Sequence, residues 1–274
     1  MGYEWRRAIA RRKVLLLVII TVLFEVAPFI VLTQLQTPAI QQLIQQFADI
    51  LWLVGILAPQ GLFLHLTAVL IASGATAEEH EHGTLDILLT QPVTRMEYLV
   101  GKYFGGFTLM MAISFLLAVL SVSLATLTFG PQRFLEHAPA IELASLYTIL
   151  LFYSLGFMFG ELYRRASLAL LTGISVLISS LVLGGILFFA FVLTNDPFYL
   201  QVDKALPAWG ATSLPRLVAE DLFLRGAQLP FLQFGPPIEG TVTEAMLIIL
   251  VYAVVAIGVT VARFRMTDIA RRAI

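Results

Sequence analysis

Long apolar runs separated by shorter polar stretches dominate the chain. Each of the main runs is close to the length of about 20 residues that an α-helix needs to cross a bilayer. We expect transmembrane helices at 14–34, 51–77, 103–129, 141–163, 168–193 and 245–262. This pattern predicts an all-α membrane protein with six transmembrane helices, folded as a single transmembrane domain over residues 1–274.

Composition supports the membrane assignment. Of the 274 residues, 59% are hydrophobic and 13% are charged, and the mean hydropathy is +0.89. A soluble domain carries roughly 25% charged residues. The net charge of −1 gives no indication of a nucleic-acid partner, and the absence of cysteine excludes disulfides and thiolate metal sites.

The Lys and Arg residues predict the orientation, because cytoplasmic loops carry an excess of them. Most lie in the two terminal segments, in residues 78–102 and at 164–165. The other side has only four of the 17, namely Arg133, Lys204, Arg216 and Arg225. We therefore expect a multi-pass protein of the plasma membrane with both termini and residues 78–102 in the cytoplasm, and with an extracytoplasmic loop at 194–243.

Two segments outside the spans have their own character. Residues 2–13 alternate arginines with Trp5, Ala8 and Ile9, which is typical of an amphipathic interface helix on lipid headgroups; a plain basic flank that orients the first span is the alternative. The loop 194–243 contains six prolines and predicts helix only at 214–224, the rest being irregular. Its aromatic residues suggest parts that lie at the outer interface or re-enter the membrane.

The polar stretch 78–106 has the most specific pattern. Thr84 is placed to cap a short helix at 85–91, which Pro92 ends because proline cannot continue the hydrogen-bond ladder. Thr94 and Glu97 form a capping-box pattern directly before the next apolar run. A short, partly apolar helix at the membrane surface suits insertion into a groove on a partner, although a structural connector is the plainer interpretation.

This stretch resembles the signature of ABC-2-type permeases, E-x-E-x-G-T-L-x-x-L-L-x-x-P-[VI]-x-R. The positions that match are Glu79, Glu81, Gly83, Thr84, Leu85, Leu88, Leu89, Pro92, Val93 and Arg95. A weaker resemblance in length and signature extends to the membrane subunit of the nitrous-oxide-reductase maturation system.

The resemblance implies a permease subunit of an ATP-binding-cassette exporter, in which residues 78–102 hold a coupling helix. It implies a homodimer or heterodimer of permeases that works with a separate ABC ATPase by alternating access. ATP and magnesium would bind that partner, since the phosphate-loop motif G-x-x-x-x-G-K-[ST] is missing from this sequence. We expect no catalytic, cofactor or metal site on this chain. His80 and His82 stand where related permeases often have Arg or Lys.

Two ionisable residues lie deep in apolar runs, Glu25 in the first and His65 in the second. A rise of about 1.5 Å per residue places both near mid-bilayer, where ionisable groups usually face a partner or a cavity. We expect a Glu25–His65 contact on the translocation path, or else a static pair between packed helices. Two other functions remain open: an ion-coupled secondary transporter that uses these residues, and a non-transporting assembly factor.

Overall fold

The computed structural model describes residues 5–6, 12–34, 37–84, 94–223 and 239–266, and no strand occurs among them. The all-α fold is confirmed. The described helices are α2 (Arg12–Gln34), α3 (Pro38–Phe47), η1 (Ala48–Ile50), α4 (Trp52–Gln60), α5 (Phe63–Glu81), α7 (Arg95–Phe129), η2 (Leu135–His137), α8 (Ala138–Tyr163), α9 (Ala166–Thr194), α10 (Phe198–Lys204), α11 (Pro207–Phe223) and α12 (Val242–Met266).

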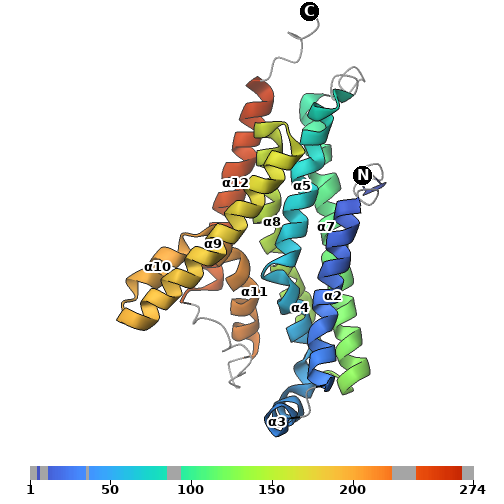
Figure 1. The fold of residues 1–274 in the computed structure, drawn as a ribbon, viewed down its shortest axis with the longest axis vertical. Helices are drawn as coiled ribbons and strands as arrows, with labels where there is room; N and C mark the ends of the chain where they lie inside the picture. The colour runs from blue at the N-terminus through green and yellow to red at the C-terminus, as the bar shows by residue number, and fades with distance from the viewer. Residues whose placement is uncertain (1–4, 7–11, 35–36, 85–93, 224–238, 267–274) are drawn as a thin grey trace, which may run out of the picture.

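The long helices run along the length of an elongated bundle (Figure 1). Within the described ranges, five helical segments are long and apolar enough to cross a membrane. They are Arg12–Gln34, Arg95–Phe129, Leu135–Tyr163, Ala166–Thr194 and Val242–Met266. These five correspond to the predicted first, third, fourth, fifth and sixth spans, and they establish a multi-pass membrane protein.

The predicted second span, 51–77, is divided into α4 and α5, which follow one another beside α2 (Figure 1). The break falls at Gly61 and Leu62, where Leu62 has φ −139° and ψ −59°. The sequence supplies the cause, since Pro59 and Gly61 are two of the poorest residues for a helix interior. Neither piece alone is among the five candidate spans, so the count of six stays a prediction.

Helix α8 is the centre of the bundle and packs against α5, α7, α9, α11 and α12. Its two glycines at GxxxG spacing lie directly on α5. A Cβ added to Gly156 would lie 3.1 Å from the Val69 Cα, and one added to Gly160 would lie 2.7 Å from the Ser73 carbonyl oxygen. The motif therefore serves close packing within one subunit, as small residues often do in membrane helices.

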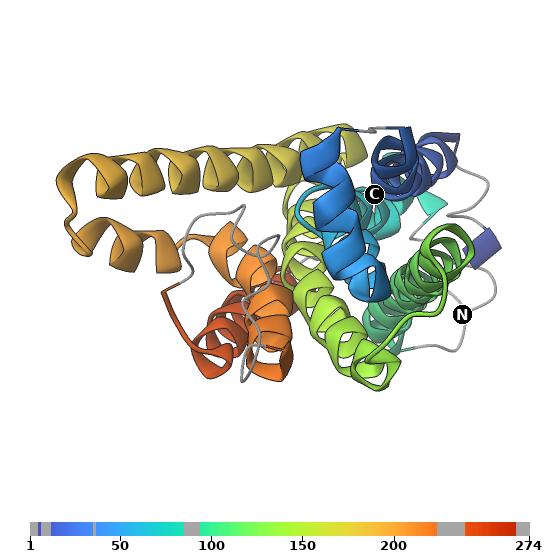
Figure 2. The ribbon, with the colours of Figure 1, turned by 90° about the horizontal axis from the view of Figure 1, so that it is seen from below.

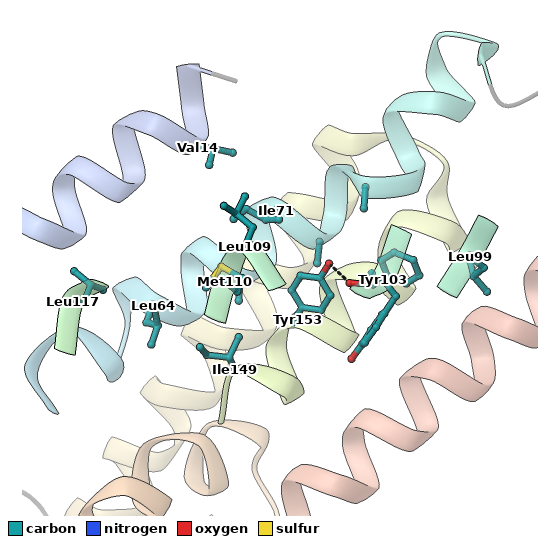
Figure 3. Packing of buried hydrophobic residues seen from close by; sticks show 14 of the residues in the cluster. Val14, Leu64, Ile71, Leu99, Tyr103, Leu109, Met110, Leu117, Ile149 and Tyr153 are labelled. Atoms are coloured by element: carbon teal, nitrogen blue, oxygen red, sulfur yellow. Dashed lines mark hydrogen bonds between the residues drawn. The ribbon is translucent and has the colours of Figure 1, made fainter. Parts of the chain in front are cut away.

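One large apolar cluster joins α2, α5, α7, α8 and α12 (Figure 3). Aromatic rings fill the space between α7 and α8: the Tyr153 hydroxyl donates a 2.9 Å hydrogen bond to the Tyr103 carbonyl, and the Tyr103 hydroxyl lies 2.7 Å from the Ser154 Oγ. The labelled members of the cluster are Val14, Leu64, Ile71, Leu99, Tyr103, Leu109, Met110, Leu117, Ile149 and Tyr153.

Helix α9 leaves the bundle at a steep angle, with α10 folded back beside it (Figure 2). Helix α11 then returns to pack on α8 and α12, and its first turn is fixed to α9 because the Ala208 N–H donates to the Ser180 Oγ at 2.9 Å. The loop 194–243 was expected to be irregular outside 214–224. That expectation is wrong for α10 and for the first half of α11. Pro197 is the N-cap residue directly before α10, and Pro207 is the first residue of α11, a position where proline is favoured.

Little of the predicted interface helix at 2–13 lies within the described residues. Trp5 is helical and its indole Nε1 donates a 3.2 Å hydrogen bond to Thr108 Oγ1 on α7. This bond ties the N-terminal segment to the bundle near the start of α2.

Candidate functional site at the ends of α5, α7, α8 and α9

The glutamates of the signature lie on the last turn of α5. This turn is at the same end of the bundle as the first residue of α2 and the last residue of α12 (Figure 1). Glu79 is buried, whereas Glu81 and Thr84 are exposed. The first glutamate therefore faces the bundle and the second lies at its surface.

Glu79 is bound by two donors from the first turns of α7. The Tyr98 hydroxyl donates to Glu79 Oε2, and the Lys102 ammonium donates to Glu79 Oε1. The side chains of Lys102 and Glu79 are 6% and 4% exposed, so this ion pair is largely out of water. A buried carboxylate is stable only when it is paired and hydrogen-bonded, and here both oxygens are.

The next two residues join α5 to α8 and α9. His80 Nε2 lies 3.2 Å from Oε2 of Glu161, which is fully buried near the end of α8. Glu81 Oε1 accepts a 3.2 Å hydrogen bond from the N–H of Ala166, the first residue of α9. An acidic side chain is well placed there, because the first N–H groups of a helix have no intrahelical acceptor and carry partial positive charge.

Gly83 lies just after the last turn of α5, one residue before the described part of the chain ends at Thr84. It has φ +66°, a left-handed conformation in which glycine is favoured because it has no Cβ. The turn redirects the chain beyond α5. The predicted coupling helix follows and lies outside the described residues, as do the signature positions Leu85, Leu88, Leu89, Pro92 and Val93.

The chain is described again from Thr94, where the predicted capping box is confirmed. Glu97 N donates to Thr94 Oγ1 at 3.2 Å, and Thr94 N donates to Glu97 Oε2 at 2.8 Å. Arg95 is the first residue of α7. These bonds satisfy two backbone N–H groups that have no acceptor within the helix. The capping box therefore defines the start of α7, which lies eight residues before the predicted third span.

This geometry joins consecutive residues of one turn to three different helices. Glu79 binds α7, His80 binds α8 and Glu81 binds α9. A force applied to the chain after Gly83 would therefore reach all three helices through short polar contacts. The sequence placed the glutamates in this segment. It did not identify Tyr98 and Lys102 as partners of Glu79, or Glu161 as the partner of His80.

The expected Glu25–His65 contact stays a prediction. Both side chains are fully buried, but neither carboxylate oxygen of Glu25 makes a hydrogen bond within the described part of the chain. His65 packs edge-on against the Phe152 ring, with centroids 5.3 Å apart. A role on the translocation path stays a prediction for both residues.

Glu142 is another polar residue that the sequence did not single out. It is 8% exposed, and its Oε1 accepts a 2.7 Å hydrogen bond from Ser114 Oγ on α7. The available signal was an acidic residue just after the start of the predicted fourth span, where an unpaired charge is costly in lipid.

No group of three or more metal-ligating His, Asp or Glu side chains converges within the described ranges.

The sequence was compared with known protein families. Residues 1–269 match the model of a family described as ABC-2 family transporter protein. No curated protein matches the sequence.

Proposed function

The chain belongs to the ABC-2 family of transporter proteins, and from this premise we propose that it is the permease subunit of an ATP-driven exporter. Members of this family are membrane transport subunits that generally work with a separate ATPase. In this proposal the energy for transport comes from a partner chain that binds ATP and magnesium. Two permease subunits and two ATPase subunits would form the complex, with the termini and residues 78–102 in the cytoplasm.

The last turn of α5 is the observation that carries the proposal. Its three contacts, from Glu79 to α7, from His80 to α8 and from Glu81 to α9, are what a segment that transmits movement requires. A partner that binds the segment after Gly83 would move three membrane helices together. Alternating access follows if the nucleotide state of the ATPase changes its binding energy for that segment, because a ligand shifts an equilibrium only through its differential affinity.

The sequence between Gly83 and Thr94 supplies the contact surface for the ATPase. Leu85, Leu88 and Leu89 share one side of the predicted helix, and an amphipathic helix binds a groove through residues at such spacing. The nitrous-oxide-reductase maturation subtype is one candidate system among exporters, and the sequence signature supports it only weakly.

The test is purification of the tagged full-length chain from its native membranes in mild detergent. We expect a co-purifying protein with a phosphate loop, and hydrolysis of Mg-ATP by the complex. Leu88→Asp and Leu89→Asp should each remove both, whereas Leu135→Asp, an equivalent change at the opposite end of the bundle, should remove neither. Reconstituted chain that transports cargo without any ATPase would refute the proposal and favour a secondary transporter.

A further inference from the structure

A cavity of about 310 Å³ lies between α2, α5 and α9, towards the end of the bundle where α2 begins and α5 ends (Figure 1). Its floor is one face of α5, since Leu70, Ser73 and Gly74 follow the spacing of three and four residues that places side chains on one side of a helix. Helix α5 packs against both α2 and α9, which form the side walls. The volume is at the lower end of the range of about 300–1,000 Å³ that is typical of small-molecule sites.

The polar side chains of this cavity make it positively charged. Arg12 and Lys13 come from the first turn of α2, and Glu78 comes from α5, so two positive charges face one negative charge. Both basic side chains are exposed, and within the described part of the chain no ion pair includes either of them. The opposite wall adds the hydroxyl of Ser167, in the first turn of α9.

This combination of donors suits a phosphate group. A guanidinium forms paired, charge-assisted hydrogen bonds to phosphate oxygens, and a lysine ammonium binds phosphate as a point charge. A serine hydroxyl can donate one further hydrogen bond. Basic pockets between membrane helices commonly bind the headgroups of anionic lipids.

The surfaces next to the cavity indicate that the phosphate belongs to a lipid. Leu16 lies one turn after Arg12 on α2, and Leu171 lies one turn after Ser167 on α9. Both leucine side chains are exposed, and both helices are long and apolar enough to cross the membrane. Acyl chains would cover these leucines while the phosphate stays at the cavity, whereas a soluble anion gains nothing from the apolar surfaces.

We infer that Arg12, Lys13 and Ser167 bind the phosphate of an anionic phospholipid, whose headgroup occupies this cavity and whose acyl chains lie along α2 and α9. The bound lipid bridges the two helices that flank α5. Only the assignment to the inner leaflet rests on the proposed orientation. Binding itself needs no ATPase, so this inference and the proposed function can fail separately.

The test is native mass spectrometry of the purified full-length chain, titrated in detergent with phosphatidylglycerol or with phosphatidylcholine of the same acyl chains. We expect one phosphatidylglycerol to bind about tenfold more tightly than phosphatidylcholine, because no choline cation offsets its phosphate charge. An excess of inorganic phosphate should not displace the bound phosphatidylglycerol, because the free ion lacks acyl chains.

Two double variants separate this site from a general effect of charge. Arg12→Gln with Lys13→Gln should lower the affinity for phosphatidylglycerol to that for phosphatidylcholine. Arg263→Gln with Arg265→Gln removes the same number of charges from exposed positions in the last turn of α12 and should leave the affinity unchanged.

Ser167→Phe keeps the test decisive if the double variant at α2 fails to fold. The change lies at an exposed position and fills the cavity while both basic residues remain, so it should also abolish the preference for phosphatidylglycerol. Equal binding of the two lipids by the parent chain, or a preference that survives in both cavity variants, would overturn the inference. Displacement of phosphatidylglycerol by inorganic phosphate would identify a site for a free anion and overturn the lipid assignment.

Discussion

Lys102 on α7 donates to Glu79 on α5, and both side chains are almost completely buried. These residues are 23 positions apart in the sequence, on either side of the predicted coupling helix. The pair therefore joins α5 to α7 near the points where the described chain stops after α5 and resumes before α7. In the proposed function, movement of the segment between them would be passed to both helices.

We expect the Lys102–Glu79 pair to matter for stability only when one partner is removed. Lys102→Met leaves a buried carboxylate without its cation, which typically costs about 3–5 kcal/mol. The double variant Lys102→Met with Glu79→Leu should recover much of that loss, because no charge remains buried. Thermal unfolding of the purified chain in detergent measures both.

Arg133→Met is the control for this prediction. Arg133 pairs with Asp49 at 3.4 Å, but its side chain is 75% exposed, and exposed pairs contribute only about 0–1 kcal/mol. The interpretation of the Lys102–Glu79 pair is wrong if Lys102→Met and Arg133→Met lower the unfolding midpoint equally.

The glycines of α8 give a second prediction. Gly160→Ala would place a methyl 2.7 Å from the Ser73 carbonyl oxygen, a backbone atom that cannot move without shifting α5. Overpacking of this kind costs about 1–3 kcal/mol, so the thermal midpoint should fall. Gly258→Ala on α12, where a Cβ meets nothing within 4 Å, should be neutral or slightly stabilising. Equal midpoints for the two variants would contradict the packing described here.

The contrast between Gly160 and Glu25 shows how much of this structure the sequence could predict. Small residues at GxxxG spacing indicate close helix packing in any bundle, and α8 packs that way. The partner of Glu25 was predicted from depth alone, by counting residues along two spans. Depth does not fix which face of a helix a residue occupies, so the Glu25–His65 contact stays a prediction.

The candidate site was predictable to the same limited extent. The signature located Glu79 and Glu81, and the capping box at Thr94 fixed the start of α7, because both are local patterns. Their partners Lys102 and Ala166 are 23 and 85 positions away. Such contacts depend on how the helices pack together, which local patterns do not encode.

Asp203 predicts a dependence of stability on pH. Burial raises the pKa of its carboxyl above the ordinary value of 3.8, because desolvation disfavours the charged form. The folded state therefore binds this proton more tightly than the unfolded state. The chain loses stability through this group as the pH rises from about 3.8 through the raised pKa.

Asp203→Asn removes this titration. At pH 7 the variant should have a higher thermal midpoint than the parent, and the difference should shrink as the pH is lowered towards 4. Glu136→Gln, at an exposed position, is the control and should follow the parent at every pH. A midpoint difference for Asp203→Asn that does not change between pH 4 and pH 7 would show that the substitution acts through packing against Gly184 and not through charge.

Glu81 tests the transmission of force from the segment after α5. Its Oε1 accepts the N–H of Ala166 at the start of α9. Glu81→Gln keeps an acceptor at this position, whereas Glu81→Leu has similar bulk and no acceptor. Because the bond is exposed, its loss should cost only about 1 kcal/mol of stability, so the folded chain and its complex with the ATPase should survive in both variants.

The expected difference is in coupling. In proteoliposomes that contain the permease and its ATPase, Glu81→Leu should transport several-fold less cargo per ATP hydrolysed, because α9 no longer follows the last turn of α5. Glu81→Gln should stay close to the parent. If both variants transport as efficiently as the parent, the bond to Ala166 is a static contact, and movement must reach the membrane helices through Glu79 and His80 alone.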